Sequence, residues 1–364
     1  MSNNHFYCII MAGGIGSRFW PISRESTPKQ FLKFSRSGKS FLRLAYDRLA
    51  DTVIPAENIV VVSLTRYKEQ VLEEIPELKP ENLLLEPYNR NTAPCLAYAC
   101  YTLLTRDPEA VIVTLPSDQV IDNYDLYRRT ITTGLEYAQK HDQILTLGIV
   151  PTRPDSNFGY IQMAQESRDG EPVKVKTFTE KPDEELARVF IDSGEFLWNA
   201  GIFISSVKVL RDELEKHAPE ITCLWKDWEN VIGTDGERNF IDKVYGECPR
   251  TSIDYAVMEK SDRVSTIPSS FGWADIGNWE SFYEYLAGVD GNGNAVSAKG
   301  KNLIQNTTGS IVYSSMGEKL IAIKGLEDYI VLDTEDILMI CPRDEAKLKE
   351  FITELAMPDF KEYR

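Results

Sequence analysis

Short apolar runs alternate with longer amphipathic stretches along the first 150 residues of the chain. The apolar runs are too short for helices and predict strands at Tyr7–Ala12, Ile59–Leu64, Leu83–Glu86, Val111–Leu115 and Ile144–Ile149. Stretches with helical periodicity lie between them and predict helices at Phe41–Asp51, Thr92–Arg106 and Tyr124–Lys140. This alternation indicates βαβ units around a largely parallel sheet.

The middle third of the chain has a different pattern. Polar residues interrupt strand-like runs at 158–162, 175–183 and 196–206, instead of flanking them. The segments 252–261 and 271–281 show the same interruptions, whereas Val207–His217 has the periodicity of a helix. Because interrupted runs usually line a pocket or mark a loop, we expect pocket or loop residues in these segments.

The pattern changes again after about residue 288. The segment GVDGNGNA at 288–295 is rich in glycine and asparagine, which predicts a linker or turn. Short strands follow without intervening helices, at Asn302–Gln305, Ser310–Tyr313, Lys319–Ile323, Tyr329–Leu332 and Ile337–Cys341, with a terminal helix at Asp344–Leu355. We therefore predict an α/β domain over residues 1–289 and a β-rich domain over residues 290–364.

The net charge of the chain limits the classes of ligand that it is expected to bind. The 364 residues are 43% hydrophobic and 26% charged, as in ordinary globular proteins, and the formal net charge is −16. Such a charge argues against a general nucleic-acid binder, which needs an extended basic surface. A polyanionic ligand would have to be met by local cations, and Arg18, Arg24, Lys29 and Lys33 form such a group.

The same composition bears on the compartment. The six cysteines show no Cys-x-x-Cys spacing and no dense disulfide framework. The N-terminus lacks a basic segment followed by an apolar one, and no run approaches the ~18 apolar residues of a membrane helix. We therefore expect a cytoplasmic protein that neither is exported nor enters a membrane.

The stretch from Tyr7 to Phe31 holds the densest candidate chemistry. Its apolar run ends in a glycine-rich turn that carries Arg18, and Lys29 follows behind two prolines. Glycine lets the backbone approach a ligand closely, and the N–H groups of such a turn form an anion-binding nest. The spacing fits neither a Walker loop nor a dinucleotide fingerprint, in which a small residue would replace Phe19. The stretch predicts a phosphate site of another class, with an ordinary tight turn as the alternative.

Two aspartates are candidate metal ligands. Asp118 ends the apolar run 111–118, at the carboxyl end of a predicted strand, and Asp275 sits between aromatic residues and glycines. Two such carboxylates, completed by phosphate and water, suit Mg²⁺. Each aspartate taken singly is more often a turn or cap residue. The pair therefore makes a metal site only if both carboxylates converge on the glycine-rich turn.

These parts suggest a reaction class. A phosphate that attacks the α-phosphorus of a nucleotide needs no nucleophile from the enzyme, but two anions must be brought together. A metal ion, Arg18 and Lys29 would neutralise their repulsion and the charge on departing pyrophosphate. Acyl transfer is not expected, because the chain has three histidines and shows no Ser-His-Asp or Cys-His arrangement.

Two further motifs suit a sugar phosphate. Glu180 offers a carboxylate to sugar hydroxyls and Lys181 offers an ammonium to a phosphate, although an exposed turn before Pro182 explains both equally well. Asn199 lies among apolar residues and must find partners if it is buried. The sequence leaves open whether this amide satisfies backbone groups or binds a hydroxyl.

Eight motifs, in order along the chain, resemble those of one family. They read GGIGSRFWPISRESTPKQF, EPYNRNTAP, LPSDQVI, FGYI, FTEKPD, WNAGIF, SIDYAVME and WADIGNW. The set resembles the mannose-1-phosphate guanylyltransferases, also called GDP-mannose pyrophosphorylases, over nearly the whole chain. The first two motifs together carry most of the specificity.

The resemblance implies a fold and an activity. The fold is α/β, with a Rossmann-like nucleotidyltransferase core around a mixed, mainly parallel sheet. The activity joins mannose 1-phosphate to GTP with the help of Mg²⁺, which makes GDP-mannose and releases pyrophosphate. The small C-terminal domain of the family resembles a short left-handed β-helix and often joins subunits, so we expect a homodimer.

The family's functional residues match positions of this chain in four groups. The residues that would hold the triphosphate are Gly13, Gly14, Gly16, Ser17, Arg18 and Lys29. The segment expected near the guanine and ribose contains Glu86, Arg90, Asn91 and Thr92. The mannose phosphate would contact Gly159, Glu180, Lys181 and Asn199, and the metal would bind Asp118 and Asp275. Within these groups, the catalytic roles would fall to Arg18, Lys29 and Asp118.

The chain departs from the family pattern at two positions. Gln119 stands where the family commonly has His, and Ala274 stands where it has Ser. Neither change removes a metal ligand, so we expect activity, with a sugar or nucleotide preference that can differ. Longer members also carry a fused isomerase domain, whereas this chain ends at Arg364, so guanylyltransferase activity alone is expected.

Two alternatives stay open on the sequence. One is the same chemistry with another sugar 1-phosphate or another nucleotide. The other is a non-catalytic subunit that senses a nucleotide sugar, which would normally have lost a metal carboxylate or the motif lysine. The presence of Asp118, Asp275, Arg18 and Lys29 favours the enzyme.

Overall fold

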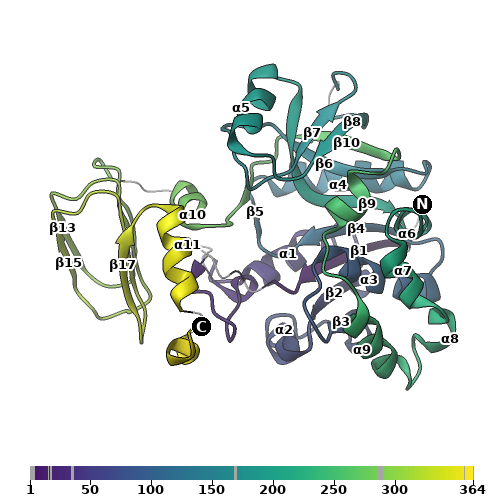
Figure 1. Cartoon of the computed structure of the whole chain (residues 1–364), viewed down its shortest axis with the longest axis horizontal. Helices are drawn as coiled ribbons and strands as arrows, with labels where there is room; N and C mark the ends of the chain where they lie inside the picture. The colour runs from purple at the N-terminus through teal and green to yellow at the C-terminus, as the bar shows by residue number, and fades with distance from the viewer. Residues whose placement is uncertain are drawn as a thin grey trace. The chain divides into compact units, whose positions relative to one another are not determined.

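The computed structural model describes residues 5–14, 16, 19–33, 37–167, 170–285, 290–355 and 357–363. The chain divides into two compact units, shown in Figure 1. The first unit comprises Met1–Gly13 and Leu42–Trp273, and the second comprises Gly14–Phe41 and Ala274–Arg364. Residues 14–41 therefore belong to the same unit as the C-terminal residues. The predicted domains were continuous in sequence, with a boundary near residue 290, and did not include this long-range association.

A nine-stranded sheet forms the centre of the first unit, in the order β3-β2-β1-β4-β9-β6-β10-β8-β7. The strands predicted from the apolar runs are β1 (Phe6–Ala12), β2 (Ile59–Leu64), β3 (Leu83–Glu86), β4 (Val111–Pro116) and β6 (Ile144–Ile149). β1 lies parallel to both β2 and β4, and β2 lies parallel to β3. The predicted βαβ arrangement is confirmed for this half of the sheet.

The sheet is mixed, as predicted, but it is not clearly mainly parallel. β9 (Phe196–Ser206) runs antiparallel to β4, β6 and β7 (Tyr160–Met163). β8 (Val173–Thr179) is antiparallel to β7 and to β10 (Val264–Ser269), and β10 is parallel to β6. Direction is set by long-range pairing, which the local pattern does not record.

Three segments that were predicted as pocket or loop residues thus contribute strands. In β8 the interruptions are polar side chains that are mostly exposed, whereas Val173 and Phe178 are buried. In β9 the interruption has a different cause, because Asn199 is buried within the strand.

Helices cover the sheet of the first unit. They are α1 (Phe41–Leu49), α2 (Lys68–Glu74), α3 (Thr92–Arg106), α4 (Tyr124–Ala138), α5 (Glu184–Ser193), α6 (Val207–His217), α7 (Pro219–Thr222), α8 (Trp228–Val231) and α9 (Glu237–Glu247). The buried α3 packs against α6, α7 and α8, and its Tyr101 ring stacks on Trp225. Among the described residues, no helix has both the length and the apolar content that crossing a bilayer requires.

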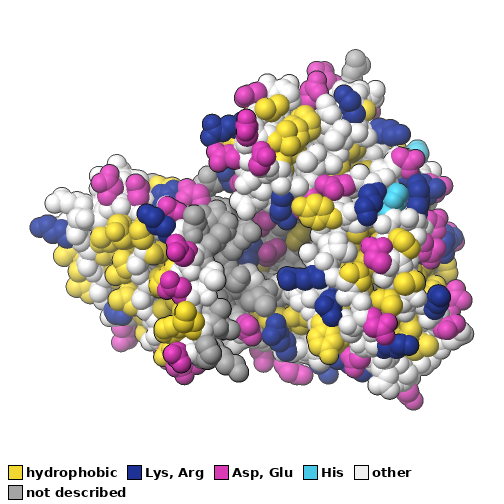
Figure 2. Space-filling model, in the orientation of Figure 1, with side chains coloured by type: hydrophobic (Ala, Val, Ile, Leu, Met, Phe, Trp, Pro, Cys, Tyr) yellow, Lys and Arg dark blue, Asp and Glu magenta, His cyan; other side chains and the backbone are white. Residues whose placement is uncertain are grey.

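Short elements complete this unit. The 3-10 helices are Ala56–Asn58, Thr65–Tyr67, Pro80–Asn82 and Cys223–Trp225, and a π-helix spans Asp254–Met258. The short strand β5 (Gln119–Ile121) follows β4, and β11 (Trp273–Asp275), which follows β10, begins in this unit and ends in the second. On the face drawn in Figure 2, acidic and basic side chains are intermixed and do not form an extended basic surface, as the net charge leads one to expect.

The second unit is built on stacked parallel strands. β12 (Ala295–Ala298), β14 (Ile311–Ser314) and β16 (Tyr329–Asp333) form one parallel sheet, which β17 (Leu338–Pro342) extends in the antiparallel direction. β13 (Asn302–Gln305) and β15 (Ile321–Lys324) pair in a second parallel sheet (Figure 1). Successive coils thus return to the same two sheets, which is the arrangement of a β-helix. Its handedness stays a prediction.

The coils enclose a small apolar core, formed by Val312, Ile321 and Val331. A buried Asn294 precedes β12, donates to Thr307 O at 2.7 Å and accepts from Ser310 N at 3.1 Å. The remaining helices of this unit are the 3-10 helix Lys29–Phe31, α10 (Trp279–Tyr285), α11 (Glu345–Glu354) and the 3-10 helix Pro358–Tyr363. All five predicted strands and the terminal helix are present, whereas β12 was not predicted.

Candidate active site

The predicted nucleotide residues begin where β1 ends. The carbonyl oxygen of Gly13 accepts a hydrogen bond from Asn89 Nδ2 at 2.8 Å. A Cβ atom at Gly13 would lie 3.0 Å from Glu86 Oε2, so glycine allows the Glu86 side chain to reach the end of β1. The structure therefore brings Gly13 and Glu86 together, 73 positions apart in sequence, at the carboxyl ends of β1 and β3.

Glu86 is a buried carboxyl group that contacts a buried tyrosine. Its side chain accepts a hydrogen bond from the Tyr245 hydroxyl, with 2.9 Å between the oxygens. Burial raises the pKa of Glu86 to about 7, and the tyrosine hydrogen bond opposes this shift only in part. Sequence reasoning missed Tyr245, because a tyrosine on the apolar side of α9 has the same pattern as a core residue.

The residues after Glu86 hold the start of α3 in place. Asn91 has a φ of 70°, and its side chain caps α3 by accepting from Thr92 N at 2.8 Å. Arg90 Nε donates to the carbonyl oxygen of Tyr245 at 2.9 Å, and Thr92 Oγ1 accepts from Ile253 N at 2.9 Å. Asn91 thus caps α3, Arg90 contacts α9, and Thr92 joins α3 to the segment that follows α9.

The predicted sugar-phosphate residues also converge. The carbonyl oxygen of Gly159 accepts from Asn199 N at 2.8 Å, and a Cβ atom at Gly159 would lie only 2.5 Å from Glu180 Oε2. Lys181 Nζ is 2.8 Å from Glu180 Oε1, and the lysine side chain is 52% exposed whereas that of the glutamate is 6% exposed. The cluster therefore presents a shielded carboxylate and an accessible ammonium side by side.

Asn199 is placed between a side-chain donor, a backbone donor and one carboxylate. Its Oδ1 accepts from Thr146 Oγ1 at 2.8 Å and from Gly201 N at 3.0 Å, and its Nδ2 donates to Asp254 Oδ1 at 3.0 Å. The amide therefore satisfies neighbouring groups and orients Asp254, which is the first of the two roles that the sequence left open.

Asp254 is a candidate site residue that sequence reasoning missed. It begins the π-helix Asp254–Met258, and desolvation and the nearby Glu180 carboxylate raise its pKa to about 7. Lys181 and the Asn199 amide act in the opposite direction. The sequence showed only an aspartate followed by the apolar run 256–258. Its hydrogen-bond partner, Asn199, is 55 residues away in sequence.

In the second unit, two predicted site residues form an ion pair. Lys29 is 4% exposed, and its Nζ lies 3.3 Å from Asp275 Oδ1. The same nitrogen lies 5.8 Å from the centroid of the Phe19 ring. Gly16 has a φ of 68°, and a Cβ atom there would lie 2.5 Å from Lys29 Cβ, so the turn and the lysine pack tightly. Gly14 is exposed.

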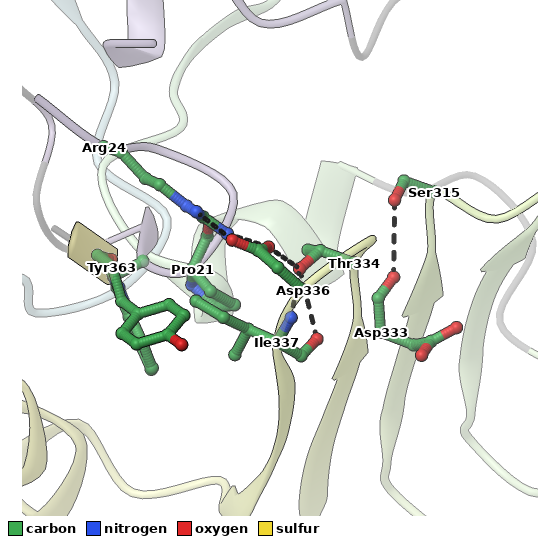
Figure 3. Close-up of polar contacts among 9 residues, drawn as sticks. Pro21, Arg24, Ser315, Asp333, Thr334, Asp336, Ile337 and Tyr363 are labelled. Carbon is green, nitrogen blue, oxygen red and sulfur yellow. Dashed lines mark hydrogen bonds and ion pairs between the residues drawn. The ribbon is translucent and has the colours of Figure 1, made fainter. Parts of the chain in front are cut away.

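The other cations of the opening stretch are distributed differently. Ser17 and Arg18 lie outside the described residues. Lys33 is exposed, and Arg24 makes an ion pair with Asp336, as Figure 3 shows. The Arg24 hydrogen bond lowers the pKa of Asp336 to about 2. The sequence grouped Arg24 with local phosphate-facing cations, whereas the structure engages its guanidinium with a carboxylate.

The two predicted metal ligands belong to different units. Asp118 is half-buried in the turn after β4, and Asp275 ends β11 with its side chain 34% exposed. Within the part of the chain that is described, no three His, Cys, Asp or Glu side chains form a group that could hold a metal ion. Next to Asp118, the side chain of Gln119 is buried and donates to Ala200 O at 2.6 Å.

Comparisons with known proteins identify the family of the chain. Residues 7–290 match the family model described as nucleotidyl transferase, and residues 300–355 match the β-helix domain model of mannose-phosphate isomerase and GMP-like proteins. The alginate biosynthesis protein AlgA of Pseudomonas aeruginosa is 36% identical over 95% of this chain and 71% of its own length. A mannose-1-phosphate guanylyltransferase of Escherichia coli K12 is 32% identical over 100% of this chain and 76% of its own length.

A solved structure shows the same architecture over almost the full chain. It is named a mannose-1-phosphate geranyltransferase, comes from Thermus thermophilus, and is 30% identical with a TM-score of 0.84. The match covers 97% of this chain and 100% of that one. The chain therefore belongs to the mannose-1-phosphate guanylyltransferase family, with a nucleotidyl transferase domain followed by a β-helix domain.

Proposed function

We propose that this protein is a mannose-1-phosphate guanylyltransferase, which makes GDP-mannose and pyrophosphate from GTP and mannose 1-phosphate. The observation that carries the proposal is the cluster of Gly159, Glu180, Lys181 and Asn199, which the ends of β7 and β8 and the middle of β9 bring together. A carboxylate for hydroxyl groups beside an exposed ammonium for a phosphate suits a sugar 1-phosphate. The assignment of nucleotidyl transfer as the reaction rests on family membership.

The proposed reaction is a direct transfer of the nucleotidyl group. An oxygen of the sugar phosphate attacks the α-phosphorus of GTP, the bond between that phosphorus and the β-phosphate oxygen breaks, and pyrophosphate leaves with the electron pair. No covalent enzyme intermediate is required, so the protein contributes positioning and charge stabilisation. The ammonium of Lys29 is suited to this role, since burial and two aromatic neighbours restrict its motion.

At the sugar end, three groups have distinct roles. Lys181 would bind the phosphate, and Glu180 would accept hydrogen bonds from sugar hydroxyls. Asp254, held by the Asn199 amide, would accept a further hydroxyl hydrogen bond when it is ionised. The proximity of two carboxyl groups and one ammonium favours a ligand that carries both hydroxyls and a phosphate.

Mg²⁺ fits the proposed site by ligand type. Asp118 and Asp275 offer hard carboxylate oxygens that are partly exposed, and the absence of a third clustered ligand among the described residues leaves the other positions to phosphate and water. When bound, the ion would neutralise phosphate charge and make the α-phosphorus more electrophilic. Asp275 also contacts Lys29, so the ammonium and the ion would act on the same polyphosphate.

A pyrophosphate-release assay with Mg²⁺ tests the proposal across a panel of nucleotides and sugar 1-phosphates. The expected result is the highest kcat/KM with GTP and mannose 1-phosphate. A higher value with another pair would overturn the substrate assignment and leave the reaction class intact. No turnover with any pair would overturn the proposed enzymatic activity and favour a non-catalytic subunit that senses a nucleotide sugar.

A further inference from the structure

The backbone that follows the glycine-rich turn is held by the C-terminal residues of the second unit. The Phe19 ring lies 5.1 Å from the Trp279 ring, measured between centroids, and Trp20 Nε1 donates to the Tyr363 carbonyl oxygen at 2.6 Å. Together with the contact between Lys29 and Asp275, these interactions secure both ends of the segment 19–29. Arg24 attaches the middle of the segment to the same unit.

Arg24 makes this attachment through both terminal nitrogens of its guanidinium group, and its Nε bonds within the segment (Figure 3). Nη1 and Nη2 donate to the two carboxylate oxygens of Asp336 at 2.7 and 2.6 Å, and Nε donates to Pro21 O at 3.0 Å. Thr334 Oγ1 donates to the same carboxylate at 3.2 Å. Such a two-point pair fixes the direction as well as the distance between the two side chains.

The backbone between Arg24 and the turn transmits this restraint. Arg24 and Thr27 exchange two backbone hydrogen bonds at 3.1 Å, which closes the tip of the segment. The carbonyl oxygen of Phe19 accepts from the backbone N–H groups of residues 22 and 23, and Phe19 N donates to Gly16 O at 3.0 Å. Backbone hydrogen bonds thus connect Gly16 with Phe19, Phe19 with residues 22 and 23, and Arg24 with Thr27.

We propose that Arg24 and Asp336 are positioning residues for nucleotide binding, which hold Gly16 and the segment 19–29 in the conformation that accepts the triphosphate. The inference rests on the proposed function, because it assigns the turn to GTP. The pair lines a cavity of about 530 Å³ and is not fully buried, with side-chain exposures of 16% for Arg24 and 45% for Asp336. Loss of the pair therefore loosens the segment 19–29 without removing a core residue, and the binding of the nucleotide weakens while that of the sugar phosphate does not.

The chain offers a closely matched control. Arg343 and Glu280 form another two-point ion pair in the second unit, with side-chain exposures of 16% and 49%. Arg343 also donates to Gly309 O at 2.8 Å and lies over the Tyr283 ring, so its contacts are with residues outside the segment 16–29. The variants Asp336→Asn and Glu280→Gln remove one charge each from equivalent environments, so a general loss of stability should be similar in both.

The test measures steady-state kinetics and hydrogen–deuterium exchange on the full chain. In Asp336→Asn we expect KM for GTP to rise at least fivefold, with KM for mannose 1-phosphate unchanged, and Glu280→Gln should keep both values. The exchanged-charge variant Arg24→Asp/Asp336→Arg should recover part of the loss. Equal KM values for GTP in the wild type and Asp336→Asn would overturn the inference.

Exchange of the ligand-free protein separates this inference from the proposed function. Amides of residues 19–29 should exchange faster in Asp336→Asn than in Glu280→Gln. If Asp336→Asn exchanges faster but the wild type does not turn over GTP, the attachment through Arg24 is supported and the proposed guanylyltransferase activity is rejected. Identical exchange in the two variants would reject the attachment whatever the substrate is.

Discussion

The ammonium nitrogen of Lys29 lies 3.3 Å from Asp275 Oδ1, so a residue predicted to bind phosphate and one predicted to bind metal contact each other directly. The lysine is almost fully buried, and the aspartate is one-third exposed. A buried ammonium without a partner is costly, and the Asp275 carboxylate gives this one a partner of opposite charge. In the proposed reaction, the Lys29 ammonium would thus be held in place before the polyphosphate binds.

Replacing Lys29 tests this charge. In Lys29→Met, a side chain of similar length keeps much of the packing against Gly16 and Phe19, so the loss should fall on catalysis. We expect kcat/KM to decrease on the order of 10²- to 10³-fold, as for the loss of one preorganised charge-stabilising group. Lys39→Met, the same change at an exposed lysine, is the control and should keep wild-type kinetics. A decrease of less than threefold in Lys29→Met would contradict the role.

The metal proposal makes a separate prediction. Chelation with EDTA should abolish pyrophosphate release, and added Mg²⁺ should restore it. Asp118→Asn removes a charge with little change in volume, so it should lower kcat on the order of 10²-fold and raise the Mg²⁺ concentration needed for half-maximal activity. Asp142→Asn, at an exposed carboxylate, should change neither quantity. Wild-type turnover in Asp118→Asn would show that the metal role is misassigned.

Local patterns were enough for the half of the sheet that is built from βαβ units. The runs at β1 to β4 and β6 are apolar because both faces of these strands are covered. A continuous apolar run can be recognised from adjacent residues in the sequence alone. The antiparallel course of β9 depends on its partners, which lie about 90 and 55 residues away, and no local period encodes that choice.

The same limit explains the cations of the opening stretch. Arg24 and Lys29 are five residues apart and equivalent in the sequence, but their partners are Asp336 and Asp275, more than 240 residues further along the chain. Asp254 is a similar case, since its importance depends on an amide in a distant strand. Motifs identified the candidate residues, and only the fold determined which of them touch.

A glycine provides a steric test of the sugar-phosphate cluster. A Cβ atom at Gly159 would approach within 2.5 Å of Glu180 Oε2, so Gly159→Ala should displace this carboxylate from Lys181. We expect KM for mannose 1-phosphate to rise about tenfold, which corresponds to the loss of roughly one charge-assisted hydrogen bond, with KM for GTP unchanged. Gly246→Ala is the control, because nothing lies within 4 Å of its Cβ position. An equal rise in both KM values would point to a general distortion instead.

Asp254 can be tested in the same assay. Asp254→Asn keeps the volume but replaces a carboxylate acceptor with an amide, which weakens hydroxyl binding and the contact with Asn199. KM for mannose 1-phosphate should rise about tenfold, again by roughly one charge-assisted hydrogen bond. Asp262→Asn, at a side chain that is 78% exposed, should leave KM unchanged. If Asp254→Asn binds the sugar phosphate as the wild type does, this residue does not contact the substrate.

Glu86 gives a prediction about stability and pH. Burial raises its pKa from 4.5 to about 7, so folding disfavours the ionised carboxyl. The stability that the neutral form provides is complete below pH 4.5 and is lost as the pH rises to about 7. Glu86→Gln cannot ionise. The free energy of unfolding of this variant relative to the wild type should therefore increase by up to about 3 kcal/mol between about pH 4.5 and pH 8.

Urea unfolding of the ligand-free protein at several pH values measures this difference for Glu86→Gln. Glu81→Gln is the matched control, because it makes the same change at an exposed glutamate five residues earlier. The control should follow the wild-type pH profile, whereas Glu86→Gln should diverge from it above about pH 5. Parallel pH profiles for all three proteins would mean that ionisation of Glu86 does not lower the free energy of unfolding. The hydrogen bond from Tyr245 would then offset the effect of burial on the pKa of Glu86 in full.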